Sequence, residues 1–359
     1  MAEIDICYKL FSLHVKLQSL FLNHDFCVSI GIIVLYLGYV GIYMVALIAL
    51  GLLSGLFFSS TFVLNRLMSL EGGHWVWSAS LRYVFMILFL LIVIRLFQGK
   101  KPLHALLKLF FTHWLFWMVA GSIGFGCFYA LLCFSADYAP AWVIAATWQL
   151  TIIASLFVLM LFGRVFPKRI WVFSTIIVIG VGLINTSHIA VLHFEEFFKG
   201  AFPVLIAAFC YPFGNQLVWE SKHGHKHFPK IDSPLLENAF NKVFLLSLGS
   251  LPFWIALVIF IHPSMPSMGQ VINTSLVALL SGLVATTLFL LARHRAHKSS
   301  ELAAVDATQA SEVIFALLGE MLFLGTPLPN EQAWFGMGLV FVGLGFFIYF
   351  QEKKSVIHD

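Results

Sequence analysis

The residues most able to do chemistry lie on one side of a predicted helix over residues 301–323. At about 100° per residue, Asp306, Gln309, Glu312 and Glu320 fall within an arc of about 120°, which we call the polar stripe. Acids inside an apolar span are costly and usually face a cavity or one another. A carboxylate in such surroundings can bind and release protons. The polar stripe therefore predicts a group that holds either a proton or a cationic ligand, unless Glu320 lies near a membrane surface or pairs structurally with Arg82.

Four further candidates lie in other predicted helices: Asn65, Arg82, Trp148 and Gln149. Trp148 and Gln149 offer aromatic and hydrogen-bonding surface. Two roles are open for Arg82. It binds an anion or a carboxylate, or it orients helices through an ion pair with Asp137, Glu71 or an acid of the polar stripe.

Two local motifs each have a functional and a structural interpretation. Pro212-x-Gly214 favours a broken helix whose freed backbone groups bind a ligand, although helix packing alone also explains it. His223-x-His225-x-His227 has the residue type of a metal site, but it falls in a short loop with three lysines. A solvated basic loop is expected there, and no metal.

The composition identifies the class of protein that must position these residues. Of the 359 residues, 60% are hydrophobic and 11% charged, whereas soluble domains have about 25% charged residues. This excludes a soluble enzyme. The net charge of +4 is small, and its basic residues are spread over short loops, which argues against a nucleic-acid partner. The chain is an all-α integral membrane protein.

Ten stretches have the length of about 20 apolar residues that a helix needs to cross the hydrocarbon core. We expect the ten spans at residues 45–66, 75–97, 114–135, 139–162, 169–187, 200–220, 240–261, 271–292, 301–323 and 332–350.

The basic residues of the loops predict the orientation of these spans. Sixteen lysines and arginines fall on one side of the membrane, and only Arg66 and Lys199 fall on the other. Because cytoplasmic loops carry an excess of Lys and Arg, both ends of the ten-helix core are expected in the cytoplasm. A cytoplasmic tail follows at residues 351–359.

Residues 1–44 are expected to lie outside the ten-helix core as an N-terminal extension. Val28–Met44 is apolar enough to insert, yet no polar loop separates it from the first span. An eleventh helix, an interfacial segment, an extension of the first span and an over-long gene model are all open.

The core contains an internal repeat, with residues 45–187 as the first unit and 200–350 as the second. An odd number of five helices in each unit means that the second copy enters from the opposite side. Such inverted repeats are typical of secondary transporters, in which the substrate lies near the midplane between the repeats. A duplicated scaffold without transport is the alternative. The repeat rests on matches at offsets of 160 to 163 residues: Arg82 with Lys242, Gly121 with Gly282, Ala146-Thr147 with Ala307-Thr308, and Trp171, Gly180 and Gly182 with Trp334, Gly343 and Gly345.

This arrangement resembles the drug/metabolite transporter superfamily, and within it the multidrug-resistance efflux transporters. The resemblance covers residues 45–350. It rests on residues 57–66 (FFSSTFVLNR), 72–83 (GGHWVWSASLRY) and 306–313 (DATQASEV), followed by Leu318-Gly319-Glu320. It implies export of small molecules.

One feature departs from that superfamily. Its repeated pattern ends the fourth and ninth helices with Gly-Glu or a similar acid. Gly319-Glu320 fits, but the first copy reads Phe162-Gly163-Arg164 and carries no acid. The two halves are therefore expected to be chemically unequal, with the proton-binding group in the second.

We expect a secondary transporter of the bacterial cytoplasmic (inner) membrane that exports small organic molecules by proton antiport and alternating access. Its partners are the substrate, protons and the lipid bilayer, with no nucleic acid and no cofactor, in a monomer or homodimer. One alternative is a metabolite exchanger or facilitator without proton coupling. Another is a membrane-bound enzyme or sensor that uses the histidine loop and the acids, although the loops hold no recognisable catalytic motif.

Overall fold

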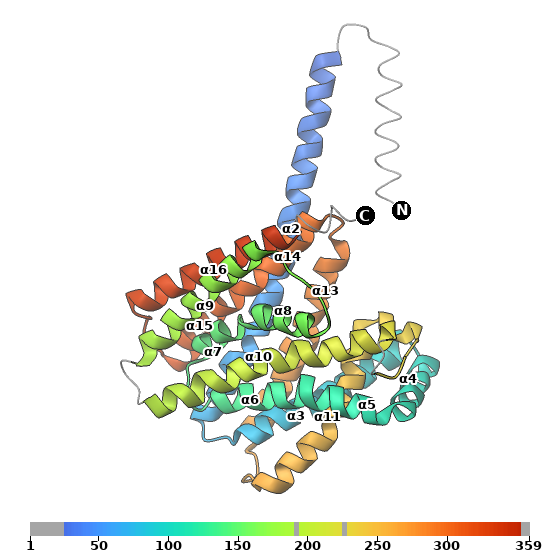
Figure 1. Cartoon of the computed structure of the whole chain (residues 1–359), viewed down its shortest axis with the longest axis vertical. Coiled ribbons are helices and arrows are strands. Elements are labelled where there is room, and N and C mark those ends of the chain that lie inside the picture. Colours follow the sequence, from blue (N-terminus) through green and yellow to red (C-terminus); the bar gives the residue numbers. More distant parts are fainter. Residues whose placement is uncertain (1–24, 190–193, 225–227, 353–359) are drawn as a thin grey trace. The chain divides into compact units, whose positions relative to one another are not determined.

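The computed structural model describes residues 25–189, 194–224 and 228–352, and every regular element within them is helical (Figure 1). The chain divides into two compact units, Met1–Ala49 and Leu50–Asp359. Helix α2 (Asp25–Leu70) runs without interruption from Asp25 through the first span. The fold described below is that of the second unit.

Ten helical segments among the described residues are long and apolar enough to cross a membrane. None of their ends differs by more than four residues from the spans predicted from the sequence, so the number and positions of the spans are confirmed. These segments, numbered here as spans 1 to 10, are Tyr43–Leu70, Trp75–Phe97, Trp114–Ser135, Ala141–Leu161, Ile170–Ser187, Phe198–His223, Ala239–Ile261, Met268–Arg295, Ser300–Leu324 and Glu331–Phe350.

Spans 1, 2, 5, 6, 7 and 10 are formed by single helices, whereas the other four are built from two or three pieces. The single helices are α2, α3 (Trp75–Phe97), α9 (Lys168–Ile189), α10 (Phe194–His223), α11 (Ala239–Ile261) and α16 (Glu331–Glu352). The pieces of spans 3 and 4 are α5 (Trp114–Gly121), η1 (Ser122–Cys127) and α6 (Phe128–Ser135), then α7 (Ala141–Trp148) and α8 (Thr151–Leu161). The pieces of spans 8 and 9 are α12 (Met268–Val277), η3 (Ala278–Ala285) and α13 (Thr286–Arg295), then α14 (Ser299–Ala307), η4 (Thr308–Ala310) and α15 (Ser311–Leu324).

The interruptions recur at matching places in the two halves. Spans 3 and 8 each contain a π-helical segment, η1 and η3. Near the middle of spans 4 and 9, a short turn interrupts the α-helical hydrogen-bond pattern while the backbone stays in the right-handed helical region, and we call this turn the break. The helices that follow begin at Thr151 and Ser311, 160 residues apart. This spacing equals that of the duplicated unit seen in the sequence. It supports a structural repeat, while the inverted orientation of the two copies stays a prediction.

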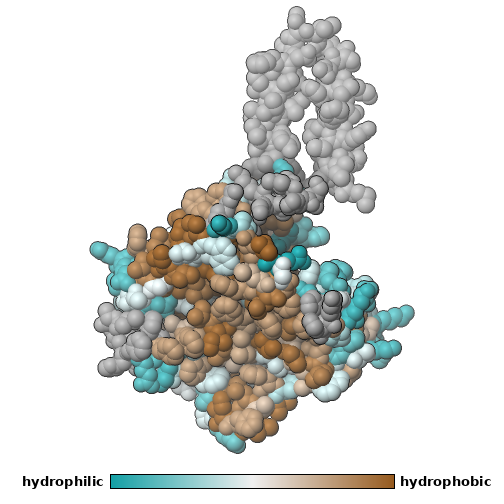
Figure 2. Space-filling model, viewed as in Figure 1, coloured by the Kyte–Doolittle hydropathy of each residue, from teal (hydrophilic) through white to brown (hydrophobic). Residues whose placement is uncertain are grey.

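The surface supports burial in lipid. Apolar residues cover the middle of the face shown in Figure 2, and hydrophilic residues gather to the left and right, where the helices end. Large apolar side chains are exposed along the spans, including Ile92, Val178, Phe260, Phe323 and Phe346. Exposed apolar patches of this extent are not stable in water and indicate a membrane-facing surface.

Two elements differ from the sequence-based expectation. The segment after span 2, expected as a basic loop, is the amphipathic helix α4 (Lys100–Thr112), which buries Leu106. Span 6 was open to interpretation as a broken helix, but α10 is continuous through Pro203 and Pro212. A Cβ on Gly214 would overlap the backbone of Gly124 in η1, so helix packing explains this glycine.

Close backbone packing depends on glycine where α5 meets α11. A methyl group on Gly249 would overlap the carbonyl oxygen of Trp117. We expect Gly249→Ala to destabilise the protein by about 1–3 kcal/mol because the two backbones must separate. Gly182 has no atom near its Cβ position, so Gly182→Ala is the matched control. Thermal unfolding in detergent should show a lower midpoint for Gly249→Ala alone, and equal midpoints would refute the close packing.

Candidate functional site

Glu312 lies in the first turn of α15, directly after the break in span 9. Its side chain is 5% exposed. Within the described residues, no hydrogen bond or ion pair reaches its carboxyl group. The backbone stays in the right-handed helical region through η4, so the chain changes to 3₁₀ hydrogen bonding there without ending the helix. Glu312 is therefore an acid without a compensating charge among the described residues, beside the break in span 9.

The sequence produces this position through glycines of α2. A Cβ on Gly51 would overlap the side chain of Thr308, and one on Gly55 would overlap the hydroxyl group of Ser311. Without these side chains, α2 can lie directly against η4 and the start of α15. The break and the acid that follows it are thus held against span 1.

Arg82 of α3 lies in a network of hydroxyl groups and aromatic rings. Its Nη2 donates to the Ser281 hydroxyl at 3.3 Å, and its guanidinium carbon lies 4.0 Å from the centre of the Tyr129 ring. Asn65 donates to the Tyr129 hydroxyl at 2.9 Å, and Thr61 donates to Ser281. This network joins spans 1, 2, 3 and 8 around one guanidinium group.

The ion pairs considered for Arg82 do not form. In the part of the chain that the structure describes, Arg82 contacts neither Asp137, Glu71 nor any acid of the polar stripe. Its Nε is buried without a hydrogen-bond partner. Of the two roles left open by the sequence, the structure removes the intramolecular ion pair in this conformation.

An aromatic cluster lies beside Arg82 and includes the predicted residue Trp148. Phe128 packs on Trp148 at 4.9 Å and on Tyr211 at 5.1 Å between ring centres. Tyr83 packs on Trp254 at 5.4 Å and on Tyr129 at 5.8 Å. We define the aromatic cluster as Tyr83, Phe125, Phe128, Tyr129, Trp148, Tyr211 and Trp254, which come from spans 2, 3, 4, 6 and 7.

Helix α2 relates the two charges to each other. Its Gly55 lies against the backbone of Glu312, and its Thr61, six residues further along, donates to Ser281, which accepts from Arg82. The guanidinium group, the rings and the carboxyl group therefore belong to one region, which we call the central site. An oppositely charged pair separated by rings can orient a molecule by stacking and by charge together.

One face of α10 leads from the central site toward the end of span 6. Tyr211 is 38% exposed although it packs against other rings, and Asn215 and Trp219 are exposed at intervals of four residues along the same face. Asn215 lies eight residues before the end of span 6, and its amide donates to the Tyr211 carbonyl at 2.9 Å, which leaves its oxygen for a polar path. This face is the best candidate for an access route to the central site.

The rest of the polar stripe does not join the central site. Asp306 forms an ion pair with Arg293 of α13, and both side chains are partly exposed. Gln309, in η4 at the break, has a buried side-chain nitrogen without a partner. Glu320 is 2% exposed and accepts a hydrogen bond at 3.3 Å from the backbone N–H of Trp142. It holds the N-terminus of α7 instead of facing Glu312.

The remaining predicted residues serve the site in different ways. Asn65 contributes through Tyr129, as described above. Gln149 lies at the break between α7 and α8, where its amide donates to the Ala145 carbonyl of its own helix at 3.4 Å. Of the histidines, His223 stacks on Trp219, and His225 and His227 lie outside the described residues.

Several residues of the central site and of the hydrogen-bond network around Arg82 were not predicted: Thr61, Tyr83, Phe125, Phe128, Tyr129, Tyr211, Trp254 and Ser281. Aromatic residues make up 16% of the chain, so single Tyr, Phe or Trp residues inside spans carry no signal. The only sequence pattern that points to them is Arg82-Tyr83, which places a cation beside a ring.

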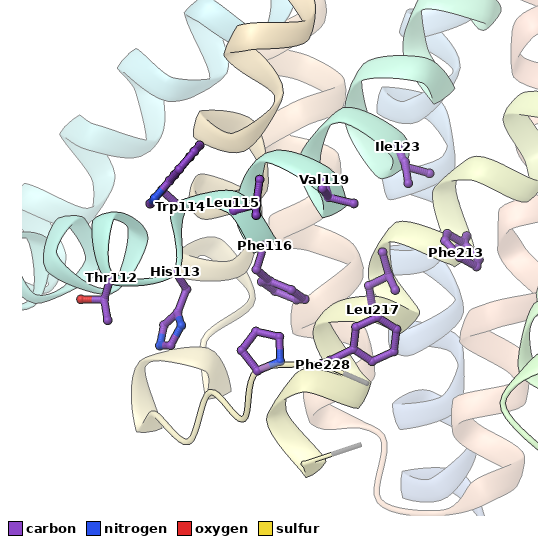
Figure 3. Close-up of a pocket in the computed structure, with 11 residues that line it drawn as sticks. Thr112, His113, Trp114, Leu115, Phe116, Val119, Ile123, Phe213, Leu217 and Phe228 are labelled. Carbon is purple, nitrogen blue, oxygen red and sulfur yellow. The ribbon is translucent and has the colours of Figure 1, made fainter. Parts of the chain in front are cut away.

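A pocket of about 630 Å³ lies between α5 and α10, away from these residues (Figure 3). Phe116 and Val119 of α5 line one side, Phe213 and Leu217 of α10 the other, and Phe228 closes part of it. Trp114 and Leu115 at its rim are exposed. The pocket contains no residue of the polar stripe and no member of the central site.

Cys127 of η1 and Cys210 of α10 lie side by side, with their sulfur atoms 3.6 Å apart. In a variant with Cys7 and Cys27 replaced by serine, we expect copper phenanthroline to join Cys127 to Cys210, because thiols this close can form a disulfide with a small shift. Peptide mass analysis should show the cross-link, which Cys127→Ser should remove and Cys133→Ser should not. A cross-link from Cys133 would contradict the placement of span 3 against span 6.

The fold and the site define a multi-pass membrane protein with interrupted spans and charged groups in its interior. The family model described as "EmrE: Putative multidrug resistance efflux transporter" matches residues 45–353. The chain belongs to this family, as the resemblance in the sequence implied.

Two relatives are themselves without an assigned function. One is "Uncharacterized protein YjlA" of Bacillus subtilis (strain 168), 36% identical over 83% of this chain and 92% of the relative. The other is "Uncharacterized 42.1 kDa protein in intracellular alkaline protease 3'region" of Shouchella clausii, 36% identical over 73% of this chain and 69% of the relative. A solved structure titled "Crystal structure of protein" has a TM-score of 0.48 and 14% identity, and the match covers 87% of this chain and 98% of that one.

Proposed function

We propose that this protein exports small organic molecules from the cytoplasm in exchange for protons, and that Glu312 binds the proton and the substrate in turn. One observation carries the proposal: Glu312 is buried, without a partner in the described residues, and next to a break in a membrane span. A stretch of 3₁₀-helix inside a longer helix often marks a functional hinge.

The exchange follows from the cost of leaving Glu312 charged and alone. A carboxylate is strongly disfavoured in an apolar interior unless it is protonated or paired with a cation. Proton and cationic substrate therefore exclude each other at the same group. If the loaded forms change their access more readily than the empty charged form, a proton entering from outside drives a substrate molecule out.

The polar face of α10 suggests where the substrate enters. Tyr211, Asn215 and Trp219 lead toward the end of span 6 that carries Lys222 and His223. The excess of lysine and arginine at this side of the membrane favours the cytoplasm. The proposed conformation is therefore open to the cytoplasm, with both ends of the ten-span core on that side and the protein in the cytoplasmic membrane.

Glu320 has a supporting role in this proposal. Its carboxyl group accepts hydrogen bonds from the first backbone N–H groups of α7, those of Ala141 and Trp142. Arg66, which donates to the Ala136 carbonyl at 2.7 Å, acts on it electrostatically. These contacts fix the half-helix that carries Trp148, so Glu320 positions the aromatic cluster.

A flux assay with purified protein in liposomes tests the proposal. An imposed pH gradient should drive movement of at least one compound from a panel that includes ethidium, tetraphenylphosphonium and aromatic metabolites, and this compound should in turn move protons. Flux that does not respond to the gradient would instead show a facilitator or exchanger. Metal in the purified protein, with no flux of any panel member, would favour the enzyme or sensor alternative.

A further inference from the structure

Arg82 presents the strongest unexplained charge in the interior. A guanidinium group stays protonated under all conditions that a protein meets, so burial cannot neutralise it. Among the described residues, it is stabilised by the Tyr129 ring and the Ser281 hydroxyl, and no carboxylate is within reach of an ion pair. A charged side chain inside a membrane span usually pairs with an opposite charge or faces a water-filled cavity. Arg82 is only partly buried, so a partner that reaches it from solution is expected during the working cycle.

The free donor on Arg82 indicates the shape of that partner. Nε is buried and unpaired. Together with a terminal nitrogen, it forms one edge of the guanidinium group, and such an edge binds the two oxygens of a carboxylate in parallel. A carboxylate on the substrate would satisfy both the orphan nitrogen and the uncompensated charge.

We propose that the exported compound is a zwitterion with an aromatic or similarly flat apolar body, whose carboxylate binds Arg82 and whose ammonium group binds Glu312. This inference rests on the proposed function and names its substrate class. The two charges have opposite signs and are each unpaired within the described part of the chain. The aromatic cluster that contacts Arg82 through Tyr129 extends through Phe128 to Tyr211.

A zwitterion explains all three features together. A compound with only a cationic group would pair Glu312 and leave Arg82 without an anion. A compound with only an anionic group would leave nothing to replace the proton on Glu312. A flat body between the two charges gains stacking against rings such as Tyr211 and Trp148, which lie 5.7 Å apart between centres.

Three compounds of nearly equal shape separate these cases: 4-(aminomethyl)benzoate, which carries both charges, 4-methylbenzylamine, which carries only the positive charge, and 4-methylbenzoate, which carries only the negative one. In proteoliposomes, we expect the zwitterion to be moved at least about tenfold faster than either analogue, which is the size expected for a charged hydrogen bond. Arg82→Gln should lose this preference, so the ratio of zwitterion flux to 4-methylbenzylamine flux should fall. Arg82→Lys should restore part of it.

The inference can fail separately from the proposed function. One outcome is that wild-type protein moves 4-methylbenzylamine or another panel cation with proton coupling but discriminates against the zwitterion. A second is that Arg82→Gln leaves the preference for the zwitterion unchanged while transport stays coupled to protons. Either outcome shows that the inference is wrong and that proton antiport stands. If transport of the zwitterion shows no proton coupling, antiport is wrong. Equal unfolding midpoints of the wild-type and Arg82→Gln proteins would show that the variant changes recognition and not folding. Where Arg82→Gln does not fold, the partial loss of the preference for the zwitterion in Arg82→Lys is measured instead.

Discussion

Replacing Glu312 by glutamine is expected to reduce pH-gradient-driven flux to the rate of protein-free liposomes. Glutamine has nearly the same shape as protonated glutamate, but it cannot release a proton, so the charged state required for coupling is never formed. Purified wild-type and variant proteins should be compared in liposomes with an imposed pH gradient and the fastest compound of the panel. The effect should be the largest of any single substitution at the central site that preserves the fold.

Asp306→Asn is the matched control for this substitution. Asp306 is an acid of the same span, but it pairs with Arg293 and is partly exposed. Exposed ion pairs contribute about 0–1 kcal/mol, so this variant should retain most of the gradient-driven flux. A Glu312→Gln protein as active as Asp306→Asn would show that the buried acid is structural.

Replacing Glu320 by alanine is expected to lower stability more strongly than it affects coupling. The change leaves the first backbone N–H groups of α7 without an acceptor, and an unsatisfied buried donor costs about 1–3 kcal/mol. Glutamine keeps one acceptor oxygen, so Glu320→Gln should lose less. Thermal unfolding in detergent should rank the midpoints as wild type, Glu320→Gln and Glu320→Ala, in falling order.

Flux per folded molecule separates this role from a role in proton binding. Both Glu320 variants should still respond to the pH gradient, because the proposed exchange occurs at Glu312. Loss of all gradient response in a stable Glu320→Gln protein would instead place proton binding at Glu320, another acid of the polar stripe.

Hydropathy was sufficient to locate the ten spans because lipid imposes a length and a composition on each of them. It could not reveal where spans break. The residues around the breaks, Trp148–Thr151 and Ala307–Ser311, contain neither proline nor glycine. Their conformation depends on neighbours such as Gly51 and Gly55, which are distant in sequence.

The polar stripe lies on one side of an ideal helix, but the structure does not bring its residues together at one site. Asp306 and Glu320 are 14 residues apart, which corresponds to about 21 Å along a helix at 1.5 Å per residue. The 3₁₀ turn η4 also shifts the helix phase between Asp306 and Glu312. One helical wheel therefore combined a residue near one end of the span, one at its break and one near the other end.

Proton release on substrate binding tests the central claim most directly. Wild-type protein in detergent and weakly buffered solution should release a proton when the fastest compound of the panel is added, because both compete for Glu312. Glu312→Gln should bind this compound more weakly and release no proton. If wild-type protein binds the compound but releases no proton at every pH at which it is folded, this result would contradict the proposed exchange.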